Sequence, residues 1–208
     1  YEYDQKHDHL IDFTKLLPNG KSYFTSASCY FNGLEKVFDF LLQKGIDPNM
    51  PDSNNLYPLE DAIYHNSLDL VKFFINTNKI DYSVKIPIVN NNEEEEEEEE
   101  FEKKLKNDKY TTYLHLAIQS GHFEIIKEFL DKNLIDINIT NSDGDTPLIE
   151  ACRFGNLDCI LTLFENDKLD FNHCNNDGDD AVEVLGGMKT KEPIKDRNEY
   201  LMIIQDYL

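Results

Sequence analysis

Four stretches of the chain share one pattern of polar and apolar positions. They open at Asn32, Asn66, Gly121 and Gly155, and each carries an acidic residue three positions later. Gly or Asn suits a tight turn between helices, and the helix dipole favours a carboxylate in the first helical turn. Apolar residues then recur at helical spacing. The pattern predicts four amphipathic helices, each of which follows a turn.

A second set of predicted helices precedes these four. The segment from Thr146 to Glu165 predicts one helix, a glycine turn and a second helix. Positions equivalent to Pro147 recur at intervals of 35, 55, 34 and 34 residues, at Tyr23, Pro58, Tyr113, Pro147 and Ala181. Such a period indicates a stacked array, because one helix pair cannot bury its own apolar face. The predicted core contains Leu59, Ala62, Val71, Leu114, Ala117, Ile126, Leu148, Ala151 and Ile160.

These motifs resemble the ankyrin repeat family, whose pattern is D-G-x-T-P-L-H-x-A, a helix, G-H-x-E, a second helix and D-x-N. The run from Asp143 to Leu148 matches this pattern almost fully, and Leu114–Ala117 followed by Gly121–Glu124 matches it in another unit. The resemblance covers about Asn19 to Leu208. It implies an all-α fold, a solenoid of stacked helix pairs with projecting β-hairpin loops. It also implies that His115 hydrogen-bonds backbone between neighbouring units.

The repeats divide the chain into five parts. We expect an N-terminal capping helix in residues 1–18, repeats 1 and 2 in 19–84, an acidic low-complexity insertion in 85–108, repeats 3 and 4 in 109–175, and an atypical C-terminal capping repeat in 176–208. The capping helix is predicted over His9 to Leu17, and the last helix over Arg197 to Tyr207. Terminal repeats are expected to be atypical because one side of each faces water.

The chain is strongly acidic, with a formal net charge of −21. This charge disfavours nucleic acid and anionic membranes as partners, and a basic protein surface is its natural complement. The run from Glu93 to Glu100 has two interpretations. It is either a solvated loop in a tolerant surface turn or an electrostatic lure for a basic segment. No apolar stretch is long enough to predict a transmembrane helix.

Candidate chemistry is sparse. The sequence has no nucleophile-elbow, phosphate-loop or dinucleotide-binding motif, and its four cysteines form no C-x-x-C pair. We therefore expect no enzyme activity, no cofactor and no metal, and we expect free thiols in a reducing compartment, the cytoplasm or the nucleus. Asn138 follows Leu130, Asp136 and Ile137 as in sites used by the asparaginyl hydroxylases that act on ankyrin repeats. It is a candidate for hydroxylation, and the alternative is that it braces the turn.

The resemblance places partner binding on the concave face, built from hairpin tips and the exposed side of each first helix. The candidate residues are Tyr30, Phe31, Asn54, Asn55, Tyr64, His65, Lys109, Tyr110, Gln119, Ser120, Asp143, Asp145, Arg153 and Phe154. Aromatic residues and Arg are typical interface anchors, although each aromatic could instead pack against a neighbouring repeat. We expect a monomeric adaptor or scaffold for a basic protein. The alternative is a regulatory or targeting domain of a larger enzyme or of a chromatin or transcription complex.

Overall fold

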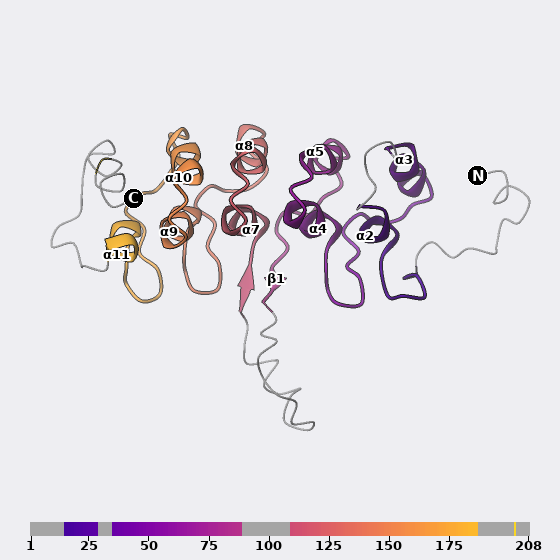
Figure 1. The fold of residues 1–208 in the computed structure, drawn as a ribbon, viewed down its shortest axis with the longest axis horizontal. Coiled ribbons are helices and arrows are strands. Elements are labelled where there is room, and N and C mark those ends of the chain that lie inside the picture. The colour runs from indigo at the N-terminus through magenta and orange to yellow at the C-terminus, as the bar shows by residue number, and fades with distance from the viewer. Residues whose placement is uncertain (1–14, 29–34, 89–108, 187–201, 203–208) are drawn as a thin grey trace, which may run out of the picture. The chain divides into compact units, whose positions relative to one another are not determined.

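The structure is a computed structural model of the chain, in which residues 15–28, 35–88, 109–186 and 202 are described (Figure 1). The chain divides into two compact units, with the boundary between Asp81 and Tyr82. Within each unit the described helices follow one another as packed pairs, with α11 as the first helix of a further repeat, so the predicted helix-pair solenoid is confirmed. All nine residues of the predicted core are buried, with at most 1% of their surface exposed.

The first unit contains two helix pairs. They are α2 (Tyr23–Ser28) with α3 (Glu35–Gln43), and α4 (Pro58–Tyr64) with α5 (Leu68–Asn76). The helix α2 packs on α3 and α4, and α4 packs on α5. Three buried phenylalanine rings form the centre of this core. The ring of Phe24 lies 5.5 Å from that of Phe38 and 5.7 Å from that of Phe74, distances typical of tilted and edge-on aromatic pairs.

In the second unit, the described residues form a pair of short strands followed by five helices. The strands β1 (Ile86–Pro87) and β2 (Tyr110–Thr111) pair in antiparallel register. The helices are α7 (Tyr113–Gln119), α8 (Phe123–Asp131), α9 (Pro147–Arg153), α10 (Leu157–Phe164) and α11 (Ala181–Gly186). The first helices α7, α9 and α11 pack in sequence, and the second helices α8 and α10 pack beside them (Figure 1).

Local sequence explains where the helices begin and end. The hydroxyl oxygens of Thr112 and Thr146 accept hydrogen bonds from backbone amides at the starts of α7 and α9. The turns that join paired helices use left-handed backbone, at Gly121 (φ 73°), Gly155 (φ 62°) and Asn66 (φ 49°). The Gly or Asn predicted to open each second helix is therefore needed for the turn at these three positions.

The projecting loops differ in part from the predicted β-hairpins. Within the described residues, the one strand ladder is that of β1 and β2. Other loops are shaped by a side chain instead. The Oδ1 atoms of Asp52, Asn141 and Asn175 each accept two backbone N–H groups, from the residues two and four positions later. Such turns satisfy the loop backbone without a partner strand.

Several predicted boundaries fall on residues outside the described ranges. The capping helix predicted over His9 to Leu17 lies largely there, and residues 15–17, which are described, carry no helix. The last predicted helix, 197–207, is outside the described residues except for Met202, and residues 89–108 of the acidic insertion are also outside them. Ile86 and Pro87, which were assigned to the insertion, pair with β2 and so belong to the hairpin that precedes α7.

Candidate functional site

A buried histidine connects neighbouring repeats in the second unit. The Nδ1 of His115 lies 2.8 Å from Thr112 Oγ1, and its Nε2 lies 2.9 Å from the backbone oxygen of Asp145 in the next loop. Burial lowers the pKa of His115 to about 4, so the ring is neutral at neutral pH. The structural role that the family resemblance implied for His115 is confirmed.

A carboxyl group occupies the same helix position in the first unit. Glu60 Oε2 accepts a hydrogen bond from the backbone amide of Tyr57 at 3.1 Å, which closes the start of α4. Burial, together with the nearby Asp52 and Asp61 carboxylates, raises the pKa of Glu60 to about 7 against the lowering effect of that amide. The site is therefore destabilised when Glu60 ionises.

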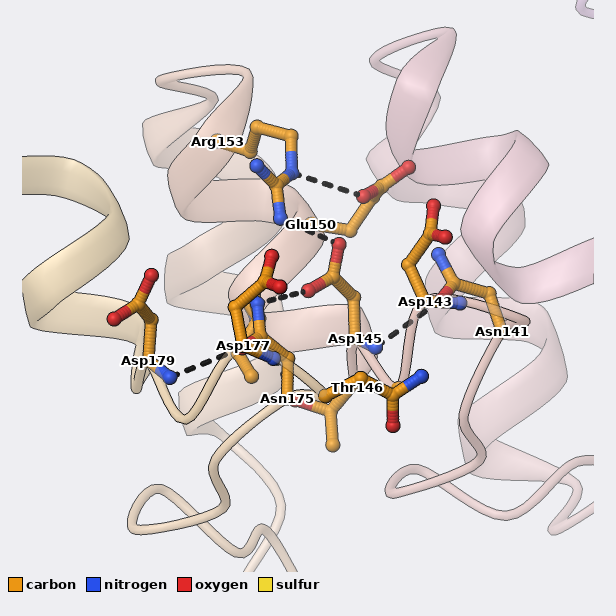
Figure 2. A network of polar contacts seen from close by, with 12 residues as sticks. Asn141, Asp143, Asp145, Thr146, Glu150, Arg153, Asn175, Asp177 and Asp179 are labelled. Atoms are coloured by element: carbon orange, nitrogen blue, oxygen red, sulfur yellow. Dashed lines mark hydrogen bonds and ion pairs between the residues drawn. The ribbon is translucent and has the colours of Figure 1, made fainter.

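A polar network lies beneath the candidate concave face of the second unit (Figure 2). At its centre, Asp145 Oδ2 accepts from Arg153 Nη2 at 2.7 Å, and Asp145 Oδ1 accepts from Asn175 Nδ2 at 2.8 Å. Glu150 extends the network, because its Oε1 accepts from Gln119 Nε2 at 2.6 Å and its Oε2 lies 3.7 Å from Arg153 Nε. Burial raises the pKa of Glu150. These five side chains join α7, α9 and the loop before α11.

The position of Asp145 differs from the expectation that it lies at an exposed hairpin tip. Its residue surface is only 2% exposed, because the side chain turns inward to Arg153 and Asn175. Arg153 is half-exposed, and its charge is offset by Asp145 and Glu150. Asp145 is thus placed to position Arg153 rather than to touch a partner directly.

The remaining expected residues fall into three groups. Tyr64 and Phe154 are 56% and 54% exposed, and Asn54, Asn55, His65, Gln119, Ser120 and Asp143 also reach solvent. Tyr110 is half-buried under Lys85, whose Nζ lies 4.2 Å from the ring centroid, and Lys109 Nζ lies 3.5 Å from Asp143 Oδ1. Tyr30 and Phe31 lie outside the described residues.

Asn138 connects two successive repeats through its side chain. Its Nδ2 donates to the backbone oxygen of Lys168 at 2.8 Å, and its Oδ1 accepts from the backbone amide of Asp170 at 2.8 Å. Asn49 makes the same pair of bonds to residues 79 and 81 in the first unit. The bracing alternative therefore has direct geometric support, and hydroxylation of Asn138 stays a prediction.

Two of the three thiols in the described ranges are buried. Burial raises the pKa of Cys152 and of Cys159 to about 12, so both stay protonated, and Cys174 is exposed. Within the described part of the chain, no group of three or more His, Cys, Asp or Glu side chains is arranged to hold a metal ion. A search of the same residues found no helix with the length and apolar character to cross a membrane.

Sequence reasoning missed the network around Asp145. The available signal was the repetition of Asn-x-Asp-Gly-Asp, at Asn141 and again 34 residues later at Asn175. An Asn at this loop position can bind its own loop through Oδ1 and still extend Nδ2 to the loop before it. Asn175 does both.

Comparisons with known proteins agree with this architecture. One family model, described as ankyrin repeats (3 copies), matches residues 88–177, and another, ankyrin repeats (many copies), matches residues 29–75. Ankyrin repeat and SOCS box protein 3 from Homo sapiens is 27% identical over 66% of this chain and 22% of its own length, and the Bos taurus protein is 28% identical over the same shares. An ankyrin repeat protein of fowlpox virus is 29% identical over 58% of this chain and 67% of its own length.

The chain thus spans about a fifth of the length of the human and bovine relatives that it matches. The two family models cover separate parts of the sequence, and a left-handed turn between paired helices occurs in both parts. This chain belongs to the ankyrin repeat family.

Proposed function

We propose that this protein is a non-enzymatic interaction module, an adaptor or scaffold that binds a basic protein through its concave face. Ankyrin repeats generally mediate protein–protein interaction, which gives the general class of the activity. The loops and first helices of each unit supply the binding surface in the proposal. The partner-contacting residues are Asn54, Asn55, Tyr64 and His65 in one unit, and Lys109, Tyr110, Gln119, Asp143, Arg153 and Phe154 in the other.

The exposure of two aromatic rings is the observation that carries this proposal. Tyr64 ends α4, and Phe154 follows α9 directly, so both lie at the end of a first helix. More than half of each residue is exposed to water, although each is large and apolar. Partner binding would remove this apolar surface from water, and aromatic residues often dominate interface energetics for that reason.

Charge supports a basic partner. Asp143 and Asp177 are exposed at successive loop tips of the second unit, in a chain whose net charge is −21. The contact between Asp143 and Lys109 is half-exposed on both sides, so it contributes only about 0–1 kcal/mol and is readily exchanged. The positive charge of Arg153 on this face is already offset by two carboxylates.

The test is affinity capture from native extract, followed by mass spectrometry and a binding titration of the captured protein. Phe154→Ala should weaken binding about tenfold, as expected for an interface anchor. The double change Asp143→Asn and Asp177→Asn should also weaken binding, and the loss of affinity should be larger at low salt than at high salt. Glu124→Gln removes one exposed carboxylate from the outer helix α8 and is the matched control.

A bait that lacks residues 90–102 separates the two interpretations of the acidic insertion. Loss of a basic partner with this deletion, and at raised salt, would support the lure. Retention of the partner would support a solvated loop. A partner that binds Phe154→Ala, the loop-tip double variant and Glu124→Gln equally well would refute the concave face as the binding site.

The alternative function is a regulatory or targeting domain of a larger enzyme or of a chromatin or transcription complex. The chain spans only 22% of its human relative, so the same repeats can serve within a much longer protein. Detection of the native polypeptide by an antibody against the repeats, with its mass and its nuclear or cytoplasmic location, distinguishes the two. Light scattering of the purified chain tests the expected monomer.

A further inference from the structure

The outer side of the second unit carries an apolar surface that the concave face does not include. Phe123 opens α8 and Leu157 opens α10 at the equivalent position, and they are 42% and 39% exposed. Leu161, one helical turn after Leu157, is 36% exposed. We call these three residues the outer ridge.

Leu161 is unusual for its position. The equivalent residue of α5 is Lys72 and that of α8 is Lys127, so two other described second helices carry a charged residue where α10 carries leucine. A position that accepts lysine without disturbing the helix does not need leucine for packing. The apolar side chain at Leu161 is therefore available for contact with another molecule.

The two helices of the outer ridge contact each other at two places along their length. Near their starts, a Cβ placed on Gly121 would lie 2.9 Å from the Nδ2 of Asn156, so the two opening turns are in close contact. Further along, Lys127 Nζ in the middle of α8 lies 3.4 Å from Oε2 of Glu165, which follows α10. The ridge is thus part of one packed surface.

A polar groove continues from the ridge at the ends of α8 and α10. Two adjoining cavities of about 390 Å³ and about 300 Å³ share Leu130, Asn133, Asn166 and Lys168. Lys127 and Glu165, which line the larger cavity, each follow a ridge residue by one helical turn. The distance along α10 from Leu157 to Glu165 is about 12 Å, at 1.5 Å per residue.

The electrostatics of this groove favour a cation. It lies at the C-terminal ends of two helices, where backbone carbonyls carry partial negative charge. The charged residues that line the larger cavity are three carboxylates, Asp131, Glu165 and Asp167, and two lysines. Lys127 is already bound to Glu165, and Lys168 donates to Asn133 Oδ1 at 3.1 Å.

We propose that the outer ridge and the groove together bind a short amphipathic helix of a second protein. Two apolar side chains of that helix, one turn apart, cover the ridge, and a lysine or arginine one turn further enters the groove. The spacing follows from the distance of about 12 Å, which is two helical turns. With a partner on each face, the repeats would bridge two proteins.

Selection from displayed helical peptides tests this proposal on the full chain. Three libraries fix Leu or Phe at positions i and i+4 and carry Lys or Arg, Asp or Glu, or Ser at position i+8. We expect binders chiefly from the basic library. Leu161→Lys should weaken the selected peptides at least tenfold, while Phe154→Ala should leave their affinity within twofold, because that residue belongs to the concave face.

A second variant tests the groove separately from the ridge. Asp131→Asn should weaken a selected Lys-containing peptide severalfold and leave its Lys→Ser analogue unchanged. Enrichment of acidic or neutral peptides, no enrichment at all, or unchanged binding to Leu161→Lys would overturn the proposal. Equal losses with Leu161→Lys and Phe154→Ala would place the peptides on the concave face and refute a separate outer site.

Discussion

Replacing Asp145 by alanine should strongly destabilise the second unit. The change removes the acceptor of Arg153 and the acceptor of the Asn175 amide together. Asn175 is buried, and a buried amide left without an acceptor costs about 1–3 kcal/mol. Loss of a fully buried ion pair would cost about 3–5 kcal/mol. The Arg153 side chain is half-exposed, however, so solvent reduces that contribution to about 1 kcal/mol.

The expected free energy of unfolding is therefore lower by about 2–4 kcal/mol. For a chain of this size, that loss lowers the melting temperature by roughly 4–16 °C. Thermal unfolding followed by circular dichroism measures the shift. Hydrogen–deuterium exchange locates it, because the amides of α9 and of the loop before α11 should exchange faster while those of α4 and α5 stay unchanged.

Asp143→Ala is the matched control. Asp143 lies two residues earlier in the same loop, and its contact with Lys109 is half-exposed, so its loss should cost less than about 1 kcal/mol. If the two alanine variants melt within 2 °C of each other, the network around Asp145 contributes nothing beyond a surface contact. The assignment of a positioning role to Asp145 would then be wrong.

Three further changes test other parts of the structure. Gly144→Ala should lower the free energy of unfolding by about 2–3 kcal/mol, because its φ is +76° and the new Cβ would lie 2.8 Å from the Asn176 backbone nitrogen. Gly178→Ala should lower it by only about 1 kcal/mol, because its φ is +81° but the new Cβ meets open space. Urea unfolding measures both losses. Glu60→Gln should stabilise the chain by roughly 1–3 kcal/mol above pH 7 and have no effect below pH 4.5. The reason is that the pKa of Glu60 is raised to about 7 in the native protein, so the native protein loses stability as the pH rises from 4.5 through 7. Melting curves recorded across this pH range measure the difference between the two proteins. Asn138→Ala should cost about 1–2 kcal/mol and accelerate exchange of the amide at position 170, to which its Oδ1 is bonded.

The helix pairs could be predicted because their signals are local and repeated. The turn residue at Gly121 or Gly155 and the acidic residue three positions later lie within a few residues of the helix start that they specify, and both recur with the 34-residue period. The role of His115 could be predicted in the same way, from a motif that the repeat shares across the family. Agreement between local patterns and the packed structure is what a repeat architecture requires.

The inward side chain of Asp145 could not be predicted from its own loop. Asn-Ser-Asp-Gly-Asp is typical of an exposed turn, and the direction of its last side chain depends on Arg153 and on Asn175, 30 residues away. The pairing of Ile86 with Thr111 was missed for a similar reason, because the acidic insertion separates the two strands in sequence. The outer groove forms only where the ends of two packed helices meet, which a helical period does not specify.

The end of α9 and the residue after it have different roles. Arg153 is held by Asp145 and Glu150, while Phe154 extends into solvent. An interface residue presented by a backbone that is already fixed loses less entropy on binding than one on a mobile loop. The network therefore stabilises the backbone that presents Phe154. A binding defect in an Asp145 variant shows that Phe154 has lost its position only if it is measured under conditions where the variant remains folded.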